Sequence, residues 1–173
     1  MRLATLGCVA AYRRKSRLTI WSGGNTRSLD FFGYYIGANP TNPYGVALTA
    51  DADHIDLYMQ NNTAGSDSST HTTWCGICAK QQIAFSQYTT CEVTINAVDR
   101  AGTLELYYGA TAPAAGTNDP ATHLIQAVPV VKGVQTISFD LSAVAVTAYP
   151  TLHGVVANTV HDLNWQITDW KFK

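Results

Sequence analysis

The residues best suited to chemistry lie between Thr70 and Lys80, in the stretch THTTWCGICAK. A tryptophan directly precedes two cysteines that are separated by two residues, the spacing used for thiol–disulfide exchange and for metal chelation. Thiol exchange requires the first cysteine at the N-terminus of a helix, where the helix dipole stabilises the thiolate. The element that holds the pair therefore decides which chemistry is available.

The surrounding pattern does not favour a redox site. A thioredoxin carries its Cys-Xaa-Xaa-Cys pair between a buried strand and a long helix, whereas Trp74 follows the polar run SDSSTHTT, which predicts a loop. The residues after Cys78 allow at most two helical turns before a β-branched run begins. Thiol–disulfide chemistry through Cys75 and Cys78 is therefore a minor alternative.

A zinc site is a second minor alternative. His71, Cys75, Cys78 and Cys91 would supply three sulfurs and one nitrogen to a tetrahedral ion. A structural zinc normally replaces a core that is too small, and this chain of 173 residues, 46% of them hydrophobic, is large enough to form its own core. Cys91 also alternates with apolar residues in CEVTINAV, so buried thiols are favoured. We predict no metal and no other cofactor.

The carboxylates offer no complete site. Asp51, Asp53 and Asp56 in DADHID form a fragment of a calcium loop without its glycine and distal glutamate. Glu92 and Glu105 are the only glutamates, and both fall on predicted strands, where two solvent-facing positions are favoured over the paired carboxylates of a glycosidase. The five histidines form no known catalytic motif. The protein is therefore predicted not to be an enzyme.

Alternation with a period of two dominates the elements around these residues. Clusters of Asn, Gly, Asp and Pro separate the alternating runs, and no window of helical length keeps a period of 3.6. This pattern predicts an all-β fold, a single antiparallel two-sheet β-sandwich of the jelly-roll type. Residues 79–85 fit a helix or a strand equally well. The expected strands cover residues 45–49, 54–60, 91–98, 103–108, 124–131, 134–142, 152–158 and 163–172.

The charge is distributed unevenly along the chain. Six basic residues precede the first acidic residue, Asp30, so residues 1–29 carry +6, while five basic and 12 acidic residues give residues 30–173 a charge of −7. We predict that residues 1–29 form a basic N-terminal arm or docking segment and that residues 30–173 form the β-sandwich domain. The arm lies along its own domain, docks on an acidic neighbouring subunit or, as the less favoured alternative, contacts nucleic acid.

Three segments near the C-terminus resemble the end of galactose-binding-like jelly-roll modules, a group with carbohydrate-binding members: VQTISFDLSAV, YPTLHGVVAN and LNWQITDWKF. The run IAFSQYTTCEVTINAV is similar to the central hairpin of such modules. The start of the chain, ATLG followed by YRRKSRLTIWSGG, is similar to small tail-associated virion proteins of phages and prophages. The resemblance covers about residues 45–173 for the fold and implies a non-catalytic binding module, with carbohydrate as ligand, in a phage or prophage tail or surface assembly.

Sugar binding requires an aromatic surface for the ring and polar groups for its hydroxyls. The candidates are Trp74, Tyr34, Tyr35 and Tyr44, while the other three tryptophans are expected in the core. The family's calcium site and aromatic platform have no residue-by-residue match here. A purely structural virion subunit, whose loops contact only neighbouring subunits, is therefore the alternative function, and a homo-oligomer is compatible with both functions.

The sequence also indicates where the protein acts. The opening MRLATLGCVAAYRRK matches an export signal poorly, and no stretch approaches the ~20 apolar residues of a membrane span. We therefore expect no signal peptide and no membrane partner. The expected location is the virion, or the bacterial cytoplasm before assembly.

Overall fold

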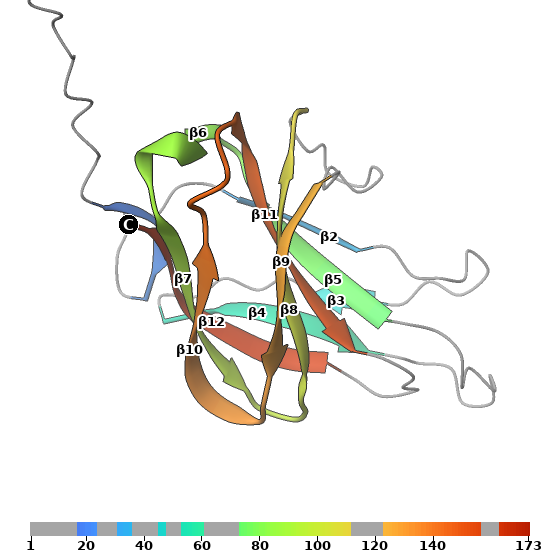
Figure 1. Ribbon diagram of the computed structural model, residues 1–173. Helices are drawn as coiled ribbons and strands as arrows, with labels where there is room; N and C mark the ends of the chain where they lie inside the picture. The colour runs from blue at the N-terminus through green and yellow to red at the C-terminus, as the bar shows by residue number, and fades with distance from the viewer. Residues whose placement is uncertain are drawn as a thin grey trace, which may run out of the picture.

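The predicted all-β sandwich is confirmed. The computed structural model describes residues 17–23, 31–35, 45–47, 53–60, 73–111, 123–156 and 163–173. These residues form two antiparallel β-sheets that pack against each other (Figure 1). Helical structure within this part of the chain is limited to the 3-10 helix η1 (Phe85–Gln87). Among the same residues, none forms a helix with the length and apolar character needed to cross a membrane.

The strands of the described residues are β1 (Leu18–Ser22), β2 (Phe31–Tyr35), β3 (Gly45–Ala47), β4 (Ile55–Gln60), β5 (Thr73–Ala79), β6 (Ile83–Ala84), β7 (Thr90–Ala97), β8 (Gly102–Gly109), β9 (His123–Val130), β10 (Gly133–Asp140), β11 (Thr147–Val156) and β12 (Leu163–Phe172).

The first sheet has the order β10-β7-β12-β4-β3, with β1 paired to β12. The second sheet has the order β2-β5-β11-β8-β9, with β6 paired to β11. Most consecutive strands lie in different sheets, so the chain passes repeatedly across the sandwich, as in a jelly roll. The segment from β6 through η1 to β7 is one such crossing, and it lies at one end of the sandwich (Figure 1).

The core lies between the sheets and is built by alternation along the strands. In β7 every second residue is buried, and the residues between them are half-buried on the opposite face. Trp165 and Trp170 are fully buried, as predicted, and Trp21 packs against the core. Burial of one tryptophan side chain contributes ~5 kcal/mol of transfer free energy.

A bulge in β12 keeps both of its tryptophans in the core. The pairing of β12 with β7 shifts between Ile167 and Asp169, so one extra residue, the exposed Thr168, enters the strand. Without this residue, Trp165 and Trp170 would face opposite sides of the sheet, because five positions separate them and side chains alternate with a period of two.

The first described strand of the chain belongs to the sandwich. Residues 18–22 form β1, which pairs with β12 from Leu18 opposite Phe172 to Ser22 opposite Asp169. Ile20 of β1 is fully buried in the core. The predicted arm of residues 1–29 therefore contains a strand of the first sheet. Residues 1–16 lie outside the described residues, and an arm formed by them stays a prediction.

Candidate functional site

The cysteine pair lies in a strand, where a loop was expected. Cys75 and Cys78 both belong to β5. Strand residues alternate between faces and rise about 3.3 Å each, so two positions three residues apart lie on opposite faces, about 10 Å from each other. A disulfide needs Cα atoms less than ~7 Å apart. β5 is followed by β6 and η1, so it also lacks the long helix of a thioredoxin. Thiol exchange within the pair does not fit this backbone.

Two of the four proposed zinc ligands lie in different sheets. Cys91 faces the core from β7 of the first sheet, whereas Cys78 belongs to β5 of the second sheet. Both thiols are buried, and burial raises the pKa of Cys91 above its usual range. His71 lies outside the described residues. Among the residues that are described, no three His, Cys, Asp or Glu side chains form a cluster able to hold a metal ion.

The two glutamates lie on opposite outer surfaces of the sandwich. Glu92 is on β7 between the buried Cys91 and Val93, and Glu105 is on β8 between the buried Leu104 and Leu106. Both side chains thus face away from the core, from different sheets. Stacked sheets are ~10 Å apart at their backbones, so carboxylates on their outer faces are farther apart than the ~5–9.5 Å of a glycosidase pair.

The outer face of the second sheet carries a cluster of polar and aromatic side chains. The strand register aligns Gly76 of β5 with His153 of β11 and Glu105 of β8, and aligns Thr151 of β11 with Tyr107 of β8. The residues between them on β8 and β11, such as Leu152 and Leu106, belong to the core. The four side chains His153, Glu105, Tyr107 and Thr151 therefore share the surface that faces away from the first sheet, and we name them the outer-face cluster.

Direct contacts hold the outer-face cluster together. The Tyr107 hydroxyl donates a hydrogen bond to Oε2 of Glu105 at 2.9 Å, and Nδ1 of His153 lies 4.0 Å from the same oxygen. The rings of Tyr107 and His153 lie against each other, with centroids 4.5 Å apart and an interplanar angle of 34°. His153 is only 3% exposed although it does not face the core. The carboxylate and both rings are thus fixed in place.

Thr151 adds a hydroxyl group without a partner. Its side chain is fully buried, and its Oγ1 makes no hydrogen bond to the part of the protein that the structure describes. A buried hydroxyl left unpaired costs about 1–3 kcal/mol. A buried water molecule that supplies a hydrogen bond at this position would recover that cost.

The aromatic residues proposed from the sequence fall partly on the same face. Tyr34 and Tyr35 lie in β2 and Trp74 in β5, all in strands that the alternation did not reveal. Tyr34 pairs with Gly76, and Trp74 is two positions before that glycine, so both belong to the row of positions on the outer face. Tyr35 pairs with Cys75 and belongs to the opposite row. Tyr44 lies outside the described residues.

Sequence reasoning did not find the outer-face cluster, although part of the signal was present. Glu105 and Tyr107 are two residues apart in the run TLELYY, and strand alternation places them on one face. His153 and Thr151 have the same spacing in YPTLHGVV. Their meeting depends on β8 and β11 being neighbours, and pairing between strands so distant in the sequence is not contained in either run.

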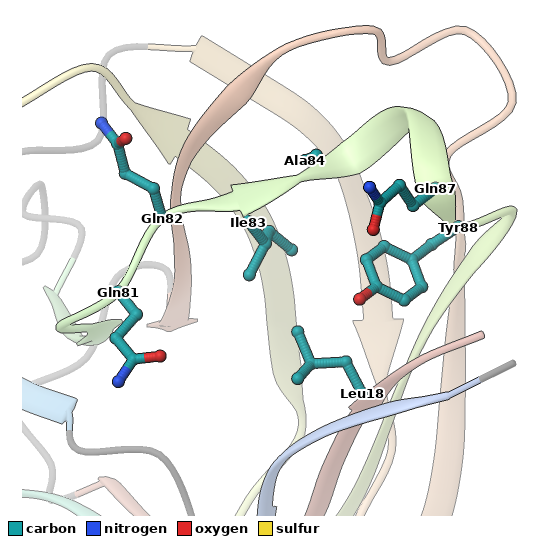
Figure 2. Close-up of a pocket in the computed structure, with 7 residues that line it drawn as sticks. All are labelled: Leu18, Gln81, Gln82, Ile83, Ala84, Gln87 and Tyr88. Atoms are coloured by element: carbon teal, nitrogen blue, oxygen red, sulfur yellow. The ribbon is translucent and has the colours of Figure 1, made fainter. Parts of the chain in front are cut away.

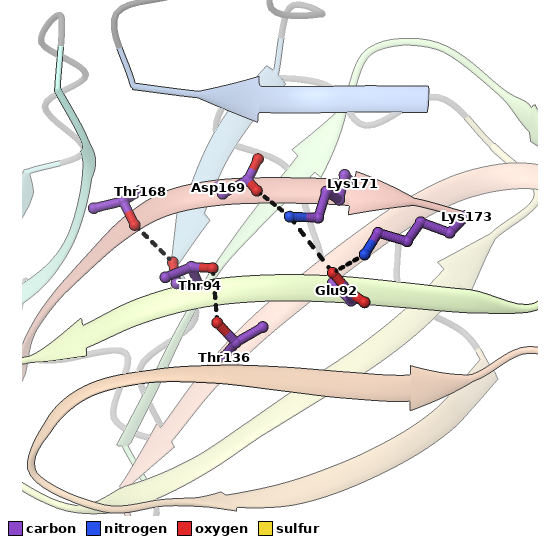
Figure 3. Close-up of polar contacts among 7 residues, drawn as sticks. All are labelled: Glu92, Thr94, Thr136, Thr168, Asp169, Lys171 and Lys173. Atoms are coloured by element: carbon purple, nitrogen blue, oxygen red, sulfur yellow. Dashed lines mark hydrogen bonds and ion pairs between the residues drawn. The ribbon is translucent and has the colours of Figure 1, made fainter. Parts of the chain in front are cut away.

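The outer face of the first sheet has a different character, because its charged side chains bind one another (Figure 3). The Glu92 carboxylate forms ion pairs with the ammonium group of Lys173 at 2.6 Å and with that of Lys171 at 3.5 Å, and Lys171 also pairs with Asp169. The Lys173 hydrogen bond lowers the pKa of Glu92, and the Asp169 hydrogen bond raises that of Lys171. On the neighbouring strands, the hydroxyls of Thr94 and Thr136 form a hydrogen bond with each other, and the hydroxyl of Thr168 donates to the backbone carbonyl of Thr94. The two carboxylates and two ammonium groups of this cluster therefore neutralise one another.

Comparison with known proteins identifies the fold but no family. The sequence matches no known family profile and no curated protein. The structure is similar to a family 11 carbohydrate-binding module from Clostridium thermocellum, with a TM-score of 0.52 and 8% identity over 90% of this chain and 94% of that one. It is also similar to a mutant of CBM29-2, a family 29 carbohydrate-binding module, with a TM-score of 0.53 and 7% identity over 92% of each chain.

A glycoside hydrolase also contains this fold as a part. The glycoside hydrolase domain of Endo-D from Streptococcus pneumoniae matches with a TM-score of 0.51 and 9% identity over 83% of this chain, but over only 21% of its own length. At these identities the likeness shows the β-sandwich fold alone.

Proposed function

We propose that this chain is a non-catalytic glycan-binding module and that it binds sugar on the outer face of its second sheet. The outer-face cluster carries the proposal, because it combines a fixed aromatic ring and a partly exposed carboxylate on a surface that does not serve the core. A sugar presents C–H groups on its ring faces and hydroxyls around its edge. Glu105 would bind hydroxyls, and the ring of Tyr107 would contact the C–H face.

The row across the sheet extends this site toward the residues proposed from the sequence. Gly76 separates Tyr34 from His153 in the strand register. Tyr34 and Trp74 occupy positions of the same row, where a longer saccharide chain would find further aromatic residues. The similarity to carbohydrate-binding modules is consistent with this proposal but does not identify the sugar. A place in a phage or prophage tail rests on the sequence resemblance alone.

A glycan array probed with the full chain tests the proposal, followed by titration of any glycan that binds. Tyr107→Ala removes the ring and should weaken binding at least about fivefold, since an aromatic contact contributes ~1 kcal/mol. Trp74→Ala should weaken binding of longer glycans by a similar factor. Thr94→Ala, on the outer face of the first sheet, is the matched control and should bind as the unmodified chain does.

Two results would contradict the proposal. Either no glycan binds, or Tyr107→Ala binds as tightly as the unmodified chain while both keep the same urea midpoint. A purely structural subunit, which contacts only neighbouring proteins, would then be the favoured function.

A further inference from the structure

A second part of the molecule has the composition of a binding site. A pocket of about 180 Å³ lies where the chain crosses from β5 through β6 and η1 toward β7, beside β1 (Figure 2). Its lining includes the amide side chains Gln81, Gln82 and Gln87 and the apolar residues Leu18 and Ile83. It shares no residue with the outer-face cluster.

Tyr88 is the fixed polar group of this pocket. The residue is only 4% exposed, and its ring packs against Phe172 with centroids 5.7 Å apart. Figure 2 shows its ring beside Leu18, with the hydroxyl at the end of the ring nearer that residue. The structure records no hydrogen bond for this hydroxyl within the described residues. Burial raises the pKa of Tyr88, so the hydroxyl remains a neutral donor at physiological pH.

The hydroxyl of Tyr88 remains accessible from the pocket, because it is not among the buried polar atoms that lack a hydrogen-bond partner. Water can bind it there, and a ligand with a hydroxyl group can replace that water. The amides of Gln81 and Gln87 provide both donors and acceptors at the same pocket, whereas Gln82 lies at its rim and points away from its centre in Figure 2.

Charge and size limit the partner. None of the described residues that line the pocket is charged, so they offer no counter-ion to a charged ligand. The volume is below the ~300–1,000 Å³ of sites for drug-sized ligands and corresponds to about six water molecules at ~30 Å³ each. A ligand that fits is therefore small and neutral, with several hydroxyls and one apolar face for Ile83 and Leu18.

We infer that this pocket is a second binding site, which takes a single neutral sugar ring, with Tyr88 as its fixed hydrogen-bonding group and the glutamine amides around it. The site is separate from the outer face of the second sheet, so each can exist without the other. A module with both sites would hold a branched or folded glycan at two points.

Nuclear magnetic resonance of the ¹⁵N-labelled chain tests the second site directly. Glucose, galactose, mannose and N-acetylglucosamine are titrated one at a time, with glucuronic acid as the charged comparison. At least one neutral sugar should shift the amide signals of residues 81–88, and glucuronic acid should shift them less. Signals of Tyr107 and His153 report the outer face separately, so failure of one site is distinguishable from failure of the other.

Variants decide whether the pocket groups make the contact. Tyr88→Phe should raise the Kd for that sugar about five- to tenfold and leave the urea midpoint within error of the unmodified chain. Gln81→Ala, an exposed side chain at the same pocket, should also weaken binding, and Thr94→Ala should not. The inference is overturned if no neutral sugar shifts the signals of residues 81–88, or if both pocket variants bind as the unmodified chain does.

Discussion

Ile20 provides the sharpest test of where the folded domain begins. It is fully buried in the core, yet it belongs to the segment whose charge predicts an arm outside the sandwich. Truncation of a buried isoleucine to alanine costs about 2–5 kcal/mol. Because Ile20 is completely enclosed, we expect ~3 kcal/mol for Ile20→Ala, a large share of the ~5–15 kcal/mol that stabilises a typical domain.

Urea unfolding followed by tryptophan fluorescence measures this change. With a slope of ~2 kcal/mol per molar urea, a loss of ~3 kcal/mol lowers the midpoint by about 1.5 M. Thr19→Ala is the matched control on the same strand. Thr19 is half-buried and next to Ile20, so its truncation should cost less than ~1 kcal/mol. Deletion of residues 1–16 should also cost little.

A free energy of unfolding for Ile20→Ala within ~0.5 kcal/mol of that of the unmodified chain, the range of an ordinary surface substitution, would contradict this expectation. The strand β1 would then contribute nothing to the sandwich, and the arm would extend to residue 29 as the charge pattern predicts.

Three further predictions concern the sandwich itself. Gly102→Ala should destabilise the fold by about 2–3 kcal/mol in thermal unfolding, because a Cβ would lie 2.5 Å from the carbonyl oxygen of Val155; an unchanged Tm would contradict that approach. The thiol of Cys91 should react with a thiol reagent only after denaturant is added, and rapid reaction of the native chain at this residue would place it outside the core. The Lys173 hydrogen bond lowers the pKa of Glu92, so the stabilisation from this ion pair is present at neutral pH and is lost as the pH falls below about 4.5. Glu92→Gln should remove that part of the acid sensitivity, which amounts to less than ~1 kcal/mol. An identical pH profile of the urea midpoint for the variant and the unmodified chain would exclude this contribution.

The strands predicted from the sequence are those with one face in the core and one face in solvent. β7 and β8 alternate for this reason, and their expected ranges agree with the observed ones within one or two residues. β5 was missed because Gly76, Ile77, Cys78 and Ala79 are all buried. A strand with both faces covered has no alternation, and glycine and alanine have low strand propensity.

The same property explains why the candidate site was predicted only in part. Trp74 was selected for its residue type, with a loop assigned to it, but its position is set by the pairing of β5 with β2 and β11. His153 was not selected, because a single histidine in an apolar run is usually a packed core residue. Its relation to Glu105 arises from strand pairing across about 50 residues of sequence, and no local pattern encodes that pairing.

The pairing of β1 with β12 also determines how the module responds to a pulling force. Leu18 lies opposite Phe172, so the two ends of this ladder that lead out of the sandwich are neighbours, and Figure 1 shows the C-terminus beside β1. Antiparallel hydrogen bonds run perpendicular to the strands. Tension that separates residues 18 and 172 therefore acts along these bonds and breaks them one after another, with no sharing of the load. β1 would peel away first and take Ile20 out of the core, so a module held by both ends would yield mechanically at its N-terminal strand.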